Sequence, residues 1–204
     1  MSAFLIPAAT TRYEQTIKHS QFIAYVAQAS TPQTAHLFIE QIRREYPDAR
    51  HVCWAFVAGK PKYTTDVSCS DDGEPAGTAG KPMLNVLLHS DIGEVVAVVV
   101  RYFGGIKLGT GGLVRAYSSS VTAALKLTPT CLKVEKQSFR LIAPYALEDS
   151  IRRLLIDLKC DLGVFEYAAE LKINGFCPIS AQTQLQQALA DLGRGQLSVE
   201  FLNE

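Results

Sequence analysis

The feature that most constrains the fold is a strand, a glycine-rich turn and a helix in direct succession at residues 94–127. EVVAVVVRYF (94–103) contains an unbroken apolar run, which is typical of a strand buried on both faces. GGIKLGTGG follows at 104–112, and GGLVRAYSSSVTAALKL at 111–127 has the composition of a helix. Free backbone N–H groups and the positive end of the helix dipole then converge at one point. The sequence therefore predicts either a plain tight turn or a site for an anion.

The glycine turn matches neither standard nucleotide fingerprint. A P-loop requires Gly-Lys followed by Ser or Thr, but Lys107 is followed by Leu108. A dinucleotide turn requires GxGxxG, but the third glycine after Gly109 and Gly111 is replaced by Val114. A specific nucleotide pocket is therefore not predicted.

A second glycine-rich loop, SDDGEPAGTAGKP at 70–82, also leads into an expected helix, which begins at Pro82. If the two loops lie side by side, they favour a phosphate backbone as the ligand. The predicted phosphate-binding cations are Lys81, Arg101, Lys107 and Arg115. The glycines expected to assist through their N–H groups are Gly104, Gly105, Gly109, Gly111 and Gly112. Three aromatic residues either stack on bases or are buried: Tyr102, Phe103 and Tyr117.

Two other functions remain open from the residues. In the first, an enzyme acts on a phosphorylated substrate, with a divalent ion on Asp71, Asp72 and Glu74 and the phosphate on Lys81. The chain offers no further carboxylate or histidine at ligand spacing nearby, and no nucleophile has an evident base. We therefore predict a protein that is not an enzyme, with no catalytic residue, no metal and no cofactor. In the second, the glycines serve folding alone and the protein is a protein-interaction module.

Composition indicates a soluble cytoplasmic protein with a local basic region. The 204 residues carry 20 Lys and Arg and 20 Asp and Glu, so the net charge indicates no partner. From Arg101 to Arg140, however, there are seven basic residues and one acid, Glu135. The five cysteines form no CxxC pair, which argues against zinc and disulfides and favours a reducing compartment. We expect no signal peptide and no membrane partner, because the longest apolar run, VVAVVV, is far too short to span a bilayer.

The order of the expected elements predicts an α+β protein of two domains, 1–130 and 131–204. The first domain is expected to hold a strand pair at 10–29, a helix at 31–47, strands at 51–59 and 62–69, a helix at 82–91, and the central strand and helix described above. The second is expected to follow the βαββαβ order of a ferredoxin-like domain: 136–144, 145–158, 160–169, 169–175, 178–193 and 195–203.

Three segments carry a resemblance to the Impact family: RHVCWAF, SDDGEPAGTAGKPML and VVVRYFGGIKLGTGGLVRAY. The resemblance covers roughly residues 15–125. It implies a first domain with the left-handed βαβ fold of the second domain of a small-subunit ribosomal protein, and a second domain similar to the last domain of elongation factor G. Eukaryotic Impact proteins regulate translation during amino-acid starvation by competing for an activator of a kinase that acts on an initiation factor.

Eukaryotic members also carry an N-terminal RWD domain, which this chain is not expected to have, so the kinase-regulating role is not carried over. What the resemblance implies is a link to translation. The expected partners are RNA or the ribosome, with a protein of the translation machinery as a further candidate; no oligomeric state is predicted.

The charge distribution assigns nucleic-acid binding to the first domain. Residues 136–204 hold seven basic and nine acidic residues, whereas 1–135 hold thirteen basic and eleven acidic. We therefore expect a fragment that ends near residue 130 to keep most of the affinity for RNA, and the tail domain to bind little.

Overall fold

The computed structural model describes residues 3–202 and confirms the predicted α+β class. The chain divides into two compact units, one formed by Phe4–Lys133 and one that begins at Val134. The elements of the first unit are β1 (Ala3–Pro7), β2 (Thr11–Ile17), β3 (Ser20–Gln28), α1 (Pro32–Glu45), β4 (His51–Val57), β5 (Val67–Ser70), α2 (Gly80–Leu88), β6 (Val95–Tyr102), α3 (Thr110–Leu127) and β7 (Thr130–Val134). Those of the second are β8 (Lys136–Ala143), α4 (Glu148–Asp157), β9 (Asp161–Tyr167), β10 (Leu171–Pro178), α5 (Gln182–Leu192) and β11 (Val199–Phe201).

The main sheet of the first unit has the strand order β2-β3-β6-β4-β5, and every neighbouring pair is antiparallel. Because β3 and β4 are both antiparallel to β6, they run parallel to each other, and α1 joins them in a βαβ crossover around β6. Thr31 and Thr34 cap α1 reciprocally, and Pro32 occupies its first turn. β7 pairs with β1 in a separate two-stranded sheet.

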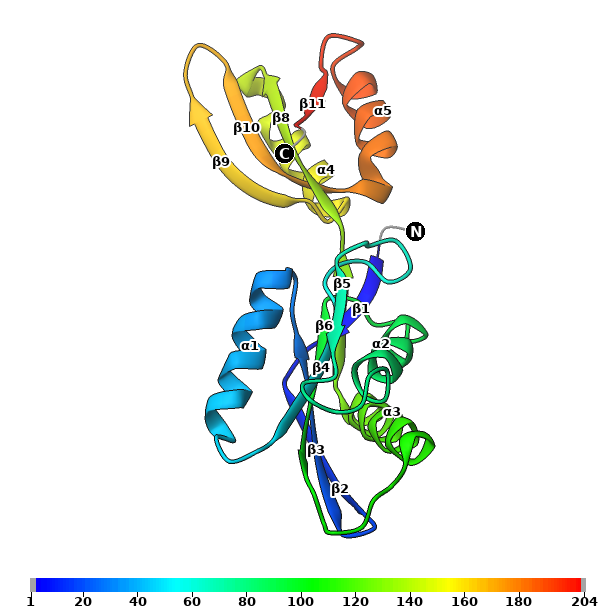
Figure 1. Cartoon of the computed structure of the whole chain (residues 1–204). Coiled ribbons are helices and arrows are strands. Elements are labelled where there is room, and N and C mark those ends of the chain that lie inside the picture. Colours follow the sequence, from blue (N-terminus) through cyan, green and yellow to red (C-terminus); the bar gives the residue numbers. More distant parts are fainter. Residues whose placement is uncertain (1–2, 203–204) are drawn as a thin grey trace. The chain divides into compact units, whose positions relative to one another are not determined.

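The central strand β6 is buried on both faces. Val96, Val98 and Val100 pack in the core under α1, while alternate residues of the strand pack in the core under α2 and α3. Figure 1 shows α1 on one side of this sheet and α2 and α3 on the other. This three-layer arrangement fixes the end of β6, and with it the start of the glycine turn.

Two expected elements of the first unit begin at different residues than predicted. β5 starts at Val67 rather than at residue 62, because the backbone forms a turn after Lys60. In this turn the amide of Thr64 donates to the carbonyl of Lys60 at 3.1 Å. α2 starts at Gly80, before Pro82, because the carboxylate of Asp71 accepts from the amides at the helix start.

The second unit has the strand order β11-β8-β10-β9, again antiparallel throughout. Together with the βαββαβ order of its elements, this is the ferredoxin-like topology that the sequence predicts. Its core is built by side chains of both helices and the sheet, including Leu141, Ile151, Ile173 and Leu189. The last strand is shorter than expected, and residue 203 of its predicted range lies outside the described residues. No helix within residues 3–202 combines the length and the apolar character that crossing a bilayer requires.

Candidate functional site

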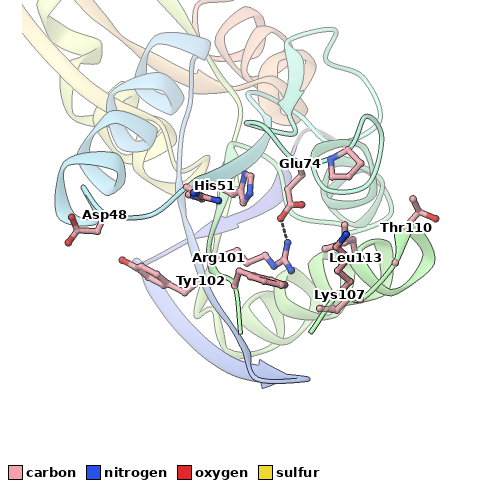
Figure 2. Close-up of a pocket in the computed structure, with 13 residues that line it drawn as sticks. Asp48, His51, Glu74, Arg101, Tyr102, Lys107, Thr110 and Leu113 are labelled. Atoms are coloured by element: carbon pink, nitrogen blue, oxygen red, sulfur yellow. Dashed lines mark hydrogen bonds and ion pairs between the residues drawn. The ribbon is translucent and has the colours of Figure 1, made fainter. Parts of the chain in front are cut away.

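The end of β6 opens into a cavity of about 670 Å³ that lies within the first unit. Strand pairing builds one wall, because Arg101 of β6 lies directly opposite His51, the first residue of β4. The turn and the first residues of α3 build the other wall. The lining residues are Asp48, Arg50, His51, Glu74, Pro75, Arg101, Tyr102, Phe103, Lys107, Leu108, Gly109, Thr110 and Leu113. Figure 2 shows Arg101 among them, with Lys107, Thr110 and Leu113 to one side and Asp48 and Tyr102 to the other.

Helix α3 begins at this cavity without a side-chain cap. Gly109 occupies the N-cap position with φ 74°, a left-handed conformation that favours glycine, and it has no side chain with which to cap. The amides of Thr110, Gly111 and Gly112 donate to no side chain among the described residues, and the first turn holds no acid. Free N–H groups and the helix dipole therefore combine at the cavity wall.

Neither packing nor backbone conformation requires a glycine at position 111. It is helical, and a Cβ added to it meets no atom within 4 Å. Gly104 is different, since an added Cβ would lie 2.0 Å from the backbone of His19. A glycine in a helix costs about 1 kcal/mol relative to alanine. What Gly111 does supply is an uncovered backbone that a ligand can approach closely.

Arg101 forms the floor of the cavity, as an almost fully buried ion pair with Glu74. Nη1 lies 2.6 Å from Oε1 of Glu74, and the two side chains are 7% and 3% exposed. Nη2 donates to the hydroxyl of Ser20 at 3.4 Å. The Nε–H group, however, has no hydrogen-bond partner within residues 3–202. Leaving a buried donor unsatisfied costs about 1–3 kcal/mol, so a ligand atom that accepts this hydrogen bond is favoured.

A hydrogen-bonded chain continues below the ion pair. The hydroxyl of Tyr117 donates to Oε1 of Glu74 at 2.8 Å. The thiol of Cys53 donates to the carbonyl of Asp71 at 2.9 Å, and its sulfur lies 3.4 Å from the hydroxyl of Tyr117. Burial raises the pKa of the Cys53 thiol and that of the Tyr117 hydroxyl well above their ordinary values. Neither group is therefore an activated nucleophile.

The three acids proposed as a metal site are not assembled into one. Asp71 accepts from the amides of Gly77, Ala79 and Gly80 at 2.8–2.9 Å. Asp72 instead accepts from the amide of Val52 at 2.7 Å and from the guanidinium of Arg43 at 2.9 Å. Glu74 pairs with Arg101, as described above. Over residues 3–202 no group of His, Cys, Asp and Glu side chains is arranged to hold a metal ion.

The predicted phosphate-binding residues do not form one surface either. Arg101, Lys107 and Gly109 line the cavity at the start of α3; of the next two glycines, Gly111 lies in the first turn of the helix and Gly112 lines the depression that also holds Arg115. Lys81 lines a separate depression of about 500 Å³ between α2 and α3. Arg115 lines a third, of about 240 Å³, beside the end of β2. Gly104 and Gly105 shape the turn itself.

The aromatic residues divide in the same way. Phe103 is 57% exposed at the cavity, and its ring centroid lies 5.6 Å from the guanidinium carbon of Arg101. Tyr117 is fully buried and Tyr102 is half-buried. Of the three aromatic residues, Phe103 is therefore the most exposed, and Tyr102 and Phe103 both line the cavity.

The sequence analysis missed Arg50, His51 and Thr110 as neighbours of the site. Arg50 and His51 lie some fifty residues before Arg101 in the chain, and only the β4–β6 pairing brings them to the same cavity. Thr110 could have been predicted from the sequence, because it is the first residue of the helix that follows the glycine turn.

The fold and this cavity define a two-unit α+β protein with an uncapped helix start at the end of its central strand. Comparison with known proteins gives the family: residues 18–125 match the Impact N-terminal domain, and the chain belongs to the Impact family. It is 42% identical to an IMPACT family member of Haemophilus influenzae, over 99% of this chain and 98% of that one. It is also 42% identical to the IMPACT family member YigZ of Escherichia coli, over the full length of both.

More distant and structural relatives agree with this assignment. The mouse protein named Protein IMPACT is 32% identical over 46% of this chain and 30% of its own length. A crystal structure described as that of a hypothetical protein superposes with a TM-score of 0.75 at 42% identity, covering 100% of this chain and 99% of its own. The resemblance inferred from the three sequence segments is thus confirmed.

Proposed function

We propose that this Impact-family protein is a non-enzymatic, cytosolic factor that binds RNA or the ribosome and acts in the regulation of translation. The observation that supports the proposal is the start of α3, whose uncapped first turn begins at Thr110 on the wall of the cavity that Lys107 and Arg101 also line. Converging amides next to a cation are a common way to bind a phosphate group.

The surroundings of this helix start are suited to an anionic partner. Lys107 and Arg50 are both exposed and have no ion-pair partner in the part of the chain that the structure describes. Lysine binds phosphate as a point charge, and arginine adds a fork of N–H donors. Phosphate groups of RNA carry the negative charge that these residues complement. The link to translation rests on the resemblance to the Impact family, and a protein of the translation machinery is the second kind of partner that we propose.

Binding of RNA by this site makes a quantitative prediction about salt. We expect the full chain to bind single-stranded RNA with an affinity that falls steeply as salt rises, because each neutralised phosphate releases counterions. Changing Lys107 to Glu reverses a charge at the cavity and should weaken binding to all RNA sequences alike, with a salt slope lower by about 1. Fluorescence anisotropy over a salt series measures both quantities.

Lys126→Glu provides the matched control, because Lys126 is an exposed lysine on the same helix α3 but in its last turn. This variant should bind RNA as the unchanged protein does. If Lys107→Glu and Lys126→Glu bind RNA equally well, the glycine turn serves folding alone and the interaction-module alternative replaces our proposal. If RNA does not bind at low salt, the RNA-binding function itself is excluded.

The cavity residues all lie in the first unit, so we also propose that the second unit contributes little to RNA affinity. The fragment boundary needs adjustment, because an end at residue 130 removes nearly all of β7, Thr130–Val134, which pairs with β1. Charge reversal on the full chain avoids this problem. Lys172→Glu, at an exposed position of β10, should leave RNA binding unchanged.

A further inference from the structure

We propose that the cavity at the start of α3 receives the phosphorylated end of an RNA strand, with the terminal phosphate on the helix amides and its nucleotide against Phe103. This inference rests on the proposed RNA binding and specifies which part of an RNA the site takes.

The first argument is the phosphate position itself. The amides of Thr110, Gly111 and Gly112 are uncapped within the described residues, and the helix they begin has 18 residues. Nothing lies within 4 Å of the place where a Cβ of Gly111 would stand. A phosphate oxygen can therefore approach the first turn of α3 as closely as hydrogen bonding requires.

The second argument is independent of the helix. Arg101 lines the same cavity, its side chain is only 7% exposed, and its Nε–H has no acceptor among residues 3–202. Glu74 and Ser20 already use the other two nitrogens. An arginine held this rigidly, with one donor left over beside a cavity, indicates an acceptor that comes from a ligand.

The third argument concerns the size and isolation of the site. A cavity of about 670 Å³ is in the range of small-ligand pockets, and so is suited to one nucleotide rather than to a duplex. The other predicted cations lie outside it: Lys81 lines a depression between α2 and α3, and Arg115 lines a smaller one that shares only Leu108 with the cavity. A strand that passed through would need cations along one continuous groove. A chain end needs only one pocket.

Charge favours a terminal phosphate over an internal one for the same reason. A phosphomonoester carries a charge of about −1.5 to −2 at neutral pH, whereas an internal phosphodiester carries a single negative charge. In the proposed complex the helix dipole, Lys107 and the Nε–H of Arg101 all attract this one phosphate group, so its additional negative charge strengthens binding. Phe103, 57% exposed on the cavity wall, then offers a ring to the base next to the phosphate.

The test compares three versions of one short single-stranded RNA on the full chain: with a 5′-phosphate, with a 3′-phosphate, and with hydroxyls at both ends. We expect at least one phosphorylated version to bind about tenfold more tightly than the hydroxyl version at equal salt. Which of the two binds more tightly identifies the end that enters the cavity. Fluorescence anisotropy with the label on the unphosphorylated end measures the difference.

Gly111→Asp tests the place of binding without weakening the fold, because an acid in the first turn of a helix is favourable and glycine there is not. The variant should lose the preference for a phosphorylated end. Gln33→Asp is the matched control, since Gln33 is an exposed residue in the first turn of α1 and gains the same charge. It should keep the preference.

The outcomes separate this inference from the proposed function. If all three RNAs bind equally and with the expected salt dependence, RNA binding stands and end recognition is wrong. If the preference persists in Gly111→Asp, the end binds elsewhere and the assignment to α3 is overturned. If no RNA binds at low salt, the proposed function fails first and the inference fails with it.

Discussion

The starts of α2 and α3 follow two glycine-rich loops of similar composition, yet they are different sites. At α2 the position of an anion is already occupied, because Asp71 accepts from the amides of Gly77, Ala79 and Gly80. At α3 no side chain of the described residues takes that place, and the helix begins at the wall of a cavity that Gly109 and Thr110 line. A glycine loop before a helix therefore indicates an anion position, and the rest of the fold decides whether the protein or a ligand fills it.

Both outcomes depend on one segment, residues 71–74. Its first acid, Asp71, caps α2, while its last, Glu74, is held by Arg101 and Tyr117 at the floor of the cavity. Glu74 therefore lines the cavity beside α3 without capping that helix. The ion pair with Arg101 is almost fully buried at the floor of the cavity, and changing it should have the largest effect.

Glu74→Gln is expected to lower the free energy of unfolding of the first unit by about 3–5 kcal/mol, because it leaves the buried Arg101 without a counter-charge. Urea unfolding followed through the fluorescence of Trp54, the single tryptophan of the chain, reports on this unit. Added phosphate should restore more stability to the variant than to the unchanged protein, since the released charge of Arg101 faces the cavity.

Glu40→Gln is the control for this change, because Glu40 is an exposed glutamate whose nearest cation, Arg43, lies 3.8 Å away. It should change the stability by less than about 0.5 kcal/mol. A loss below about 1 kcal/mol in Glu74→Gln would show that the buried pair does not hold the floor of the cavity.

Asp71→Ala is expected to cost about 2 kcal/mol of stability in the first unit, since three amides at the start of α2 lose their acceptor. The same urea unfolding experiment measures it. Asp91→Ala removes an exposed carboxylate that pairs with Lys62 and should cost no more than about 0.5 kcal/mol. If the two variants are equally stable, Asp71 does not stabilise the start of α2 as an anion would, and the difference between α2 and α3 is not supported.

The pH dependence of the Asp71 contribution follows from its ionisation. Partial burial by itself raises the pKa of this carboxyl, but the three backbone N–H donors outweigh it and hold the pKa below its usual value. A lowered folded-state pKa contributes stability above the unfolded-state pKa of about 4, and this stability is lost as the pH falls through the folded-state pKa. The difference in stability between the unchanged protein and Asp71→Asn should therefore shrink below about pH 4. A difference that stays constant on acidification would contradict the role of the charge.

The sequence was informative where one local pattern determines one local structure. The apolar run at β6 predicted a strand buried on both faces, and the element order predicted the ferredoxin-like second unit. Because the helix start after the glycines depends on neighbouring residues alone, the sequence also marked Gly109 and Lys107.

The sequence was uninformative where burial and pairing between distant segments decide. Nothing near Arg101 in the chain shows that Glu74 neutralises it, because the loop of Glu74 reaches β6 only through packing in the folded unit. Nor does the sequence show that Lys81, Lys107 and Arg115 line three different depressions. Charge in a sequence is therefore a poor guide to a binding surface until the partners of each charge are known.

The smallest expected effect compares one substitution at the two helix starts. Gly111→Ala should raise the stability of the first unit by about 0.5–1 kcal/mol, because alanine is the better helix former and its Cβ meets no neighbour within 4 Å. Gly80→Ala, in the first turn of α2, should lower it, since the added Cβ would lie 2.7 Å from the backbone of Ser70. Urea unfolding through Trp54 fluorescence decides the sign of each change. If Gly111→Ala destabilises the unit, the glycine has a folding role and ceases to be evidence for a ligand. If Gly111→Ala stabilises the unit but weakens RNA binding, the natural glycine lowers stability in order to leave the backbone at the start of α3 accessible to a ligand. At the start of α2 no such access is needed, because Asp71 of the protein itself occupies the anion position.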